Sequence, residues 1–253
     1  MNHLQLFALS DFPQVASGDD LARFTVEALG RDGLRLRPDD ALVFAQKVVS
    51  KAEGRLVELA SVTPGDEALR LARTVRKDPR LVELVLRESR RVVRAAPDVL
   101  IVEHRLGLIM ANAGIDQSNV AGPDGDCVLL LPEDPDASAM RLRERLAQLT
   151  GCESAVIISD SFGRPWRVGT VGVAIGCAGL PAILDLRGHS DLFGRPLRVS
   201  IVGHADEIAS AASVLMGQAS EARPVVLIRG LPARTAHRPA SALLRPPGED
   251  LFR

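Results

Sequence analysis

Residues 155–167 read Ala-Val-Ile-Ile-Ser-Asp-Ser-Phe-Gly-Arg-Pro-Trp-Arg, an apolar run followed at once by polar residues. The run 155–158 predicts a buried strand, because a short apolar stretch ahead of a turn signal is typical of one. Asp160 and Ser161 are then expected at the exposed end of this strand. Open α/β sheets hold their ligands at such strand ends. A loop with two arginines and the single tryptophan of the chain would follow.

The carboxylate of Asp160, beside a hydroxyl and followed by Arg164 and Arg167, is suited to a cation and a phosphate group. Mg²⁺ and Mn²⁺ prefer oxygen ligands, and the arginine fork matches phosphate oxygens. The same string also fits a strand-end turn with a surface ion pair. The residues of this stretch alone leave both interpretations open.

The composition is that of a globular protein. The 253 residues, 46% of them hydrophobic, suffice for one large domain or two intimately joined ones. A balance of 31 basic and 32 acidic residues disfavours nonspecific nucleic-acid binding. No apolar stretch approaches membrane-spanning length, and the first residues do not resemble a signal peptide. The three separated cysteines indicate reduced thiols. We therefore expect a cytoplasmic protein without nucleic-acid or membrane partners.

Apolar periodicity predicts alternating helices and strands along the whole chain. Helices are predicted over residues 19–29, 66–77, 79–94, 136–150 and 205–216. Strands are predicted over residues 41–49, 98–103, 106–111, 154–159, 171–176, 197–203 and 224–228. Glycines at 30, 151 and 217 are expected to end helices. The two strands around His104-Arg105 predict a hairpin that delivers residues 112–116 to one end of a sheet.

Several common catalytic motifs are missing from the sequence. It contains no phosphate loop of the Gly-x4-Gly-Lys-Ser/Thr type, no Gly-x-Gly-x-x-Gly, no His-Glu-x-x-His and no Gly-x-Ser-x-Gly. The remaining candidates are acids and amides on turns. Asp116 and Asn119 are three residues apart and could converge on one ligand, although such residues also cap turns for local reasons. For Asp206 and Glu207 we favour a purely structural place in a first helical turn.

Two further features permit a phosphate site without requiring it. Lys47 and Lys51 follow an apolar strand and could reach phosphates as point charges, but lysines there are more often solvated. The glycine-rich run 169–179 allows close backbone approach. We interpret it as tight packing of a strand against a helix.

Five longer strings carry a family resemblance. They are Ala-Gln-Lys-Val-Val-Ser-Lys-Ala-Glu-Gly at 45–54, Lys-Asp-Pro-Arg-Leu-Val-Glu-Leu-Val-Leu-Arg-Glu-Ser at 77–89, Ala-Asn-Ala-Gly-Ile-Asp-Gln-Ser-Asn-Val at 111–120, Ile-Ser-Asp-Ser-Phe-Gly-Arg-Pro-Trp-Arg at 158–167 and Ala-Ile-Gly-Cys-Ala-Gly at 174–179. Together with the closing residues 244–253, they resemble the coenzyme F420-0 gamma-glutamyl ligase family in order over essentially the whole chain.

The resemblance implies a GTP-dependent ligase that joins L-glutamate to the carboxylate of the deazaflavin F420-0 and releases GDP and phosphate. It implies an α+β, two-domain fold of the family's own type, neither a phosphate-loop nor an ATP-grasp fold. Residues 1–253 would form one ligase domain of two intimately joined subdomains, assembled as an intertwined homodimer. Mn²⁺ or Mg²⁺ is expected, with K⁺ as a further cation. Some members carry an additional nitroreductase-like domain, which we do not expect here, since the sequence ends at Arg253.

The resemblance also suggests roles for individual residues. Asp116 and Asp160 resemble metal-binding acids, with Ser161 as a further ligand where threonine is common in the family. The residues that resemble GTP contacts are Phe12, Pro13, Gln14, Val15, Gln46, Lys51, Asn119 and Gln218. No catalytic base or covalent nucleophile is identified. Two alternatives stay open: another nucleotide-dependent amide ligase or phosphotransferase, and a nucleotide-binding protein without catalysis.

Overall fold

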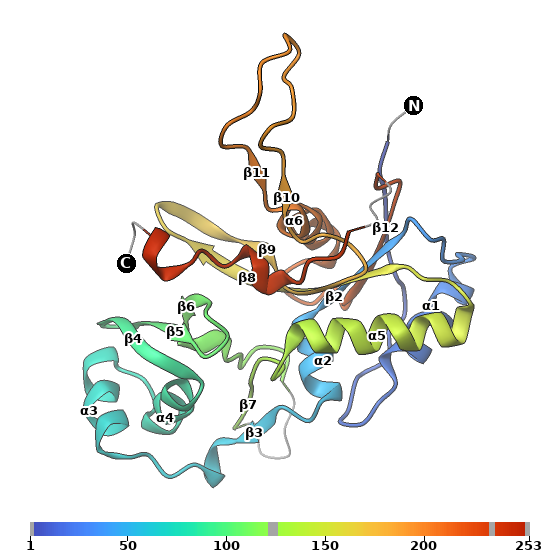
Figure 1. Cartoon of the computed structure of the whole chain (residues 1–253). Helices are drawn as coiled ribbons and strands as arrows, with labels where there is room; N and C mark the ends of the chain where they lie inside the picture. The colour runs from blue at the N-terminus through green and yellow to red at the C-terminus, as the bar shows by residue number, and fades with distance from the viewer. Residues whose placement is uncertain (1–2, 121–125, 233–235, 251–253) are drawn as a thin grey trace.

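The computed structural model describes residues 3–120, 126–232 and 236–250, and over these it has a mixed α/β fold (Figure 1). Its α-helices are α1 (Leu21–Arg31), α2 (Gln46–Ala52), α3 (Asp66–Val75), α4 (Pro79–Arg87), α5 (Pro135–Thr150) and α6 (His204–Met216). Its strands are β1 (Gln5–Ala8), β2 (Ala41–Ala45), β3 (Leu56–Glu58), β4 (Ser89–Ala96), β5 (Val99–His104), β6 (Ile109–Ala111), β7 (Cys127–Leu129), β8 (Ala155–Arg164), β9 (Arg167–Ala178), β10 (Leu184–Asp185), β11 (Ile201–Val202) and β12 (Val225–Arg229). Short 3-10 helices are η1 (Leu59–Ser61), η2 (Asn112–Gly114), η3 (Ala240–Leu243) and η4 (Pro247–Glu249).

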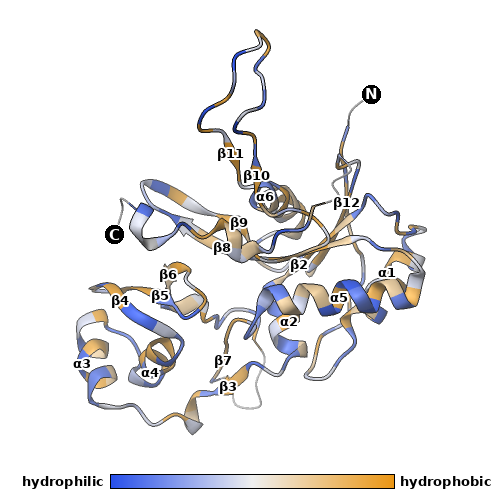
Figure 2. Ribbon diagram, in the orientation of Figure 1, coloured by the Kyte–Doolittle hydropathy of each residue, from blue (hydrophilic) through white to orange (hydrophobic). Residues whose placement is uncertain are grey.

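The largest sheet has the strand order β1-β12-β2-β8-β9 and is covered on both faces. Strands β2 and β8 run parallel, and the other neighbours are antiparallel. Along β2, Leu42 and Phe44 pack with the helices α1 and α5, whereas Val43 packs on the opposite face with α6. A strand that is buried on both faces has a continuous apolar sequence, as β2 does. In Figure 2, by contrast, α5 shows both hydrophilic and hydrophobic residues, as expected of a helix with one face on the core.

Strand β9 lets helices approach through its glycines. A Cβ atom at Gly172 would meet the Ala209 carbonyl of α6, and one at Gly176 would meet the Pro135 carbonyl of α5. The register shifts between Ile158 and Ser159 of β8. Gly176 pairs with Ile158 and Ala174 with Ser159, so β9 holds one extra residue between them. Such a bulge re-aims side chains beside functional sites. The close contacts of Gly172 with α6 and of Gly176 with α5 confirm the interpretation of the run 169–179 as tight packing of a strand against helices.

A separate hydrophobic cluster forms beside the main sheet. It gathers residues of α3, α4, β5, η2 and β7, with the three-stranded sheet β4-β5-β6. The β3–β7 pair leads into this region, which lies beneath the β8–β9 hairpin in Figure 1. The 3-10 helix η2 follows β6 and leads to Asp116, so this region delivers one wall of the candidate site.

A long arm projects from the opposite side of the main sheet. The short β10–β11 pair forms its base, and residues 186–200 form the extended loop that is seen in orange in Figure 1. Leu192, Phe193 and Val199 are almost fully exposed on it, with 99%, 83% and 85% of their surface accessible. Over the described residues, no helix is both long and apolar enough to cross a bilayer.

Several predicted elements are confirmed. Helix α5 ends at Gly151, which adopts the left-handed conformation, and α6 ends at Gly217. Strands β5 and β6 form the predicted antiparallel hairpin. Asp206 lies in the first turn of α6, where its carboxylate accepts a hydrogen bond from the backbone of Ala174.

Other predicted boundaries are wrong. The run 41–49 changes from strand to helix at Gln46. Helix α1 does not end at Gly30: it continues to Arg31, and Gly33 takes the left-handed conformation after it. The amide of Leu34 bonds to Leu29 and that of Gly33 to Gly30, which is the hydrogen-bond pattern of a glycine-terminated helix.

Three more segments differ from the prediction. The predicted helix 79–94 ends at Arg87, and its last part is strand β4. The predicted strand 197–203 is reduced to Ile201–Val202. The predicted strand 154–159 continues to Arg164, because β9 pairs with it beyond the core. Asp160 and Ser161 therefore lie within a strand of a hairpin instead of at a strand end.

Candidate functional site

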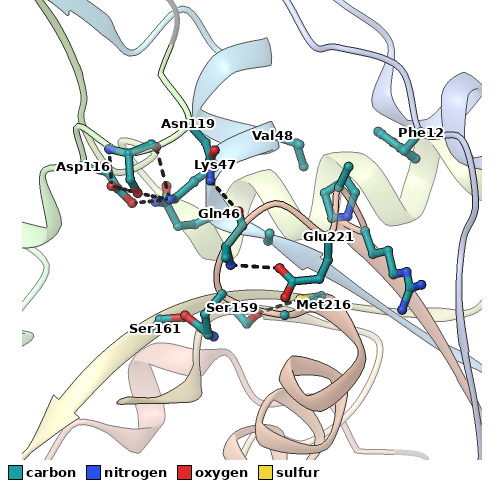
Figure 3. A pocket seen from close by; sticks show the side chains of 18 of the residues that line it. Phe12, Gln46, Lys47, Val48, Asp116, Asn119, Ser159, Ser161, Met216 and Glu221 are labelled. Carbon is teal, nitrogen blue, oxygen red and sulfur yellow. Dashed lines mark hydrogen bonds and ion pairs between the residues drawn. The ribbon is translucent and has the colours of Figure 1, made fainter. Parts of the chain in front are cut away.

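A cavity of about 700 Å³ opens where β2 ends and α2 begins. Most of its wall comes from five segments: residues 12–15, the end of β2 with α2, the turn 116–120, residues 159–161 of β8, and residues 216–224 at and after the end of α6. Gly172 of β9 and Ser213 of α6 complete it. Figure 3 shows these segments converging from different parts of the chain. A cavity of this size is typical of sites for small molecules and cofactors.

Every residue that the sequence analysis selected for GTP or metal lines this one cavity. They are Phe12, Pro13, Gln14, Val15, Gln46, Lys51, Asp116, Asn119, Asp160, Ser161 and Gln218. Arg164 and Arg167 lie farther along the hairpin and are not among the lining residues. The structure brings the selected residues together, and their individual roles stay predictions.

Gln46, the first residue of α2, is buried with 1% of its area exposed. Its Oε1 accepts a hydrogen bond of 2.9 Å from Ser50 Oγ, one turn along the helix. Its Nε2 has no hydrogen-bond partner within the described ranges. A buried amide donor without a partner is costly. Gln46 lines the cavity, so this unsatisfied amide lies at the cavity wall.

Two lysines of α2 bind the turn that carries Asp116 and Asn119. Lys47 Nζ lies 2.8 Å from Asp116 Oδ2, and Lys51 Nζ donates to the carbonyl of Asn119 at 2.9 Å. Residues four apart on a helix share a face. The amide of Asn119 in turn donates to the carbonyl of Ala219 at 3.0 Å, which connects this turn to the segment after α6.

The charged groups of the pocket perturb one another. The pKa of Asp160 is raised to about 6, mainly by burial and also by the nearby charge of Asp116, while the backbone hydrogen bond at Ser161 and the charge of Lys47 act in the opposite direction. Burial lowers the pKa of Lys51, and the charge of Lys47 contributes to the same effect. Perturbed pKa values gathered in one cavity are a mark of functional sites.

The donor set of this pocket fits a hard divalent cation. Asp116 and Asp160 repel each other, and Ser161, which also lines the cavity, carries a third oxygen. Within the described residues, no group of three or more His, Cys, Asp or Glu side chains is arranged to hold a metal ion. Mg²⁺ is usually held by one or two carboxylates together with substrate phosphates and waters. The two acids are therefore a sufficient protein contribution only if a phosphate ligand completes the site.

The sequence analysis missed some lining residues. Ser118 Oγ accepts from Lys47 at 2.8 Å, and Glu221, which is labelled in Figure 3, accepts a backbone hydrogen bond from Ala219 at 2.8 Å. Ser118 stands in the string 111–120 without an assigned role, and Glu221 belongs to none of the quoted strings. The place of Glu221 in the wall depends on β12 lying next to β2, which brings the segment before β12 to the end of β2. No local pattern in the sequence announces that pairing.

Comparison with known proteins identifies the family to which this chain belongs. Residues 11–230 match the model of the F420-0:Gamma-glutamyl ligase family. The chain is 45% identical over 252 residues to the Coenzyme F420:L-glutamate ligase of Methanothermobacter thermautotrophicus, covering 99% of both proteins. It is 47% identical over 244 residues to the protein of the same name from Methanopyrus kandleri, covering 95% of this chain and 94% of that one.

A relative from Haloarcula marismortui with the same name is 39% identical over 256 residues, covering 99% of this chain and 96% of its own. These similarities include all five segments of the cavity wall, since residues 12–224 lie inside the region matched by the family model. The resemblance seen in the separate sequence strings is confirmed over the full fold. This chain belongs to the F420-0:gamma-glutamyl ligase family.

Proposed function

We propose that this protein joins L-glutamate to the carboxylate of coenzyme F420-0 through an amide bond, with conversion of GTP to GDP and phosphate. The family membership supports the ligase activity and the two substrates. The choice of GTP rests on the family resemblance alone, because contacts to phosphates would accept any nucleoside triphosphate. The reaction belongs to the biosynthesis of coenzyme F420.

The observation that carries the proposal is the single cavity shared by two acids, a hydroxyl, two lysines and a buried amide donor. Lys47 and Lys51 give positive charge. Asp116 and Asp160 give oxygen ligands in the same cavity. A nucleotide triphosphate with a divalent cation needs both kinds of group, and pre-arranged charges are the principal means of promoting phosphoryl transfer.

The chemistry follows from the poor reactivity of a carboxylate toward amines. A carboxylate oxygen of F420-0 attacks the γ-phosphorus of GTP, and the bond between that phosphorus and the β–γ bridging oxygen breaks to release GDP. The glutamate amine then attacks the acyl carbon of the acyl phosphate, phosphate departs, and the nitrogen loses a proton. Lys51 and Gln46 would bind and orient the nucleotide during both steps. No side chain becomes covalently attached.

Asp116, Asp160 and Ser161 would hold Mn²⁺ or Mg²⁺ in this proposal, with K⁺ as a further cation. The divalent ion supplies charge neutralisation at phosphate oxygens. The role of the protein is to keep both acids ionised, side by side and close to the lysines. Lys47 favours the ionised form of Asp160 electrostatically, which offsets part of the effect of burial.

We extend the proposal to the assembly. The main sheet and the separate cluster around α3 and α4 would be the two joined subdomains of one family-specific fold, distinct from phosphate-loop and ATP-grasp folds. The projecting arm would wrap around a second copy in an intertwined homodimer. This proposal of a homodimer is supported by the exposure of three apolar residues of the arm, Leu192, Phe193 and Val199. Exposed apolar side chains gathered on one segment mark interaction surfaces.

The decisive test is turnover of purified protein with GTP, F420-0, L-glutamate and Mn²⁺, with products identified by mass spectrometry. We expect GDP, phosphate and an acceptor that is heavier by one or more glutamates. Parallel reactions replace GTP by ATP, add K⁺, or use another carboxylate acceptor. Product formed only with another acceptor would favour a different ligase or phosphotransferase. GTP binding with no product from any acceptor would favour a non-catalytic nucleotide-binding protein.

A further inference from the structure

Lys47 forms an ion pair inside the cavity, and the family resemblance assigned it no role in the site. Its Nζ lies 2.8 Å from Asp116 Oδ2 and donates to Ser118 Oγ at 2.8 Å and to the Ser118 carbonyl at 3.3 Å. An ammonium group has three N–H donors, so these three acceptors satisfy it. The two side chains of the ion pair are only 29% and 24% exposed, which limits screening by solvent.

The carboxylate of Asp116 is engaged at both oxygens. Its Oδ1 accepts from the backbone N–H of Ser118 at 3.0 Å and from Ser118 Oγ at 2.8 Å, while Oδ2 takes the ammonium of Lys47. A divalent cation shared by Asp116 and Asp160 needs an oxygen of this carboxylate. It would also bring two positive charges next to the ammonium, and like charges at short range in a partly buried site repel strongly.

We infer that Lys47 and the divalent cation compete for Asp116, and that cation binding releases the Lys47 ammonium toward the phosphates of the nucleotide. The inference rests on the proposed function. Lys47 first positions Asp116 and the turn 116–119 against α2, and afterwards adds a positive charge beside Lys51. The flexible four-carbon stem of lysine permits this change of partner without movement of the helix. Binding of the cation would thereby prepare the pocket for the nucleotide.

The first test is Mn²⁺ binding to the nucleotide-free protein, followed by the paramagnetic resonance signal of free Mn²⁺. In Lys47→Met the competitor is gone, so we expect Mn²⁺ to bind about tenfold more tightly than in the wild type. Lys51→Met is the matched control, because it removes an equal charge one helical turn away, from a lysine that is bound to a carbonyl and not to a carboxylate. It should change Mn²⁺ affinity by less than about threefold. Unchanged or weaker Mn²⁺ binding in Lys47→Met would overturn the inference.

The second test compares GDP affinity in EDTA with GDP affinity at saturating Mn²⁺, by calorimetry. Lys47→Met should leave GDP affinity within about twofold in EDTA and lower it about tenfold with Mn²⁺, because only then is the ammonium free for phosphates. An equal loss under both conditions would show that Lys47 does not change partner. Should Lys47→Met fail to fold, Ser118→Ala loosens the hold on the ammonium while keeping its charge. It should tighten Mn²⁺ binding about threefold, and no change would overturn the inference.

Failure of this inference is distinguishable from failure of the proposed function. If wild-type protein binds Mn²⁺ and makes product but Lys47→Met gains no Mn²⁺ affinity, only the role of Lys47 is overturned. If wild-type protein neither binds Mn²⁺ nor makes product, both are overturned. Tighter Mn²⁺ binding in Lys47→Met supports the competition even if GTP is replaced by another nucleotide.

Discussion

Lys51 Nζ donates a hydrogen bond of 2.9 Å to the carbonyl oxygen of Asn119, a residue 68 positions away in the sequence. This bond holds α2 against the turn 116–119. The side-chain amide of Asn119 connects the same turn to the carbonyl of Ala219. Burial and the charge of Lys47 lower the pKa of Lys51, so the ammonium is held in a site where its charge is costly. A phosphate group in the cavity would compensate that cost.

Lys51→Met should therefore weaken the binding of GTP and GDP. The expected loss is about 1.5–3 kcal/mol, the range for hydrogen bonds to charged groups, with binding of F420-0 largely unchanged. Lys51→Arg should restore part of the affinity, since a planar fork does not replace a compact ammonium. Calorimetric titration of each ligand measures these effects, with Lys77→Met, outside the cavity, as the control. Equal GTP affinity in Lys51→Met and wild type would remove Lys51 from the site.

Asp116→Asn and Asp160→Asn should each lower turnover by about 10²-fold or more. Each variant removes a negative charge from a site with few protein oxygen ligands, and charge stabilisation by a metal contributes several kcal/mol. Turnover at saturating Mn²⁺ measures the effect. Asp66→Asn changes an exposed acid at the start of α3 and should retain wild-type turnover. Near-wild-type turnover in either cavity variant would exclude that acid from the site.

Substitutions of Ser161 test whether its hydroxyl binds the cation or whether the residue has only a structural place in β8. If its hydroxyl binds the cation, Ser161→Thr should keep activity, whereas Ser161→Ala should raise the metal concentration that gives half the maximal rate. Titrations of both variants with Mn²⁺ and with Mg²⁺ give these concentrations. Identical titrations for Ser161→Ala and wild type would leave the hydroxyl without a role in metal binding.

Asp160 should make stability depend on pH in metal-free protein. Its pKa is about 6 when folded against an ordinary value of 3.8, so the ionised group is unfavourable in the folded state. As pH falls from about 7.5 to about 5, the folded protein takes up a proton that the unfolded chain does not, and stability should rise by about 1.4 kcal/mol. Urea unfolding in EDTA measures this gain. The same gain in Asp160→Asn would show that it comes from another group.

Gly176→Ala should destabilise the fold, because the added Cβ would collide with the Pro135 carbonyl at the start of α5. Overpacking of this kind costs about 1–3 kcal/mol. Gly30→Ala is the matched control: Gly30 lies inside α1 with open space around its Cβ position, and alanine there should stabilise by about 0.5–1 kcal/mol. Thermal unfolding of the two variants should show shifts of opposite sign. Shifts of the same sign would contradict the close packing of β9 against α5.

The residues of the candidate site could be selected from the sequence because long strings around them resemble one family. Reasoning from single residues identified Asp160, Ser161 and Asp116 as candidates, since acids and hydroxyls near turns suggest oxygen ligands. It could not recognise Gln46, Gln218 or residues 12–15, whose side chains are chemically ordinary. It also gave no reason to connect Lys47 with Asp116, because that ion pair exists only once α2 lies against the turn 116–119.

The sequence by itself determined the elements whose signals are local. Gly151 ends α5 because it can adopt the left-handed conformation, and the apolar periodicity of α6 needs no partner to be recognised. Tertiary structure decided the rest. The run 41–49 is apolar except at Gln46 and Lys47 and fits a strand or a helix, and β2 ends at Ala45 because its pairing with β8 ends at Ser159. Pairing with β9 likewise carries β8 past Asp160, since a strand continues as long as a neighbour supplies its backbone hydrogen bonds.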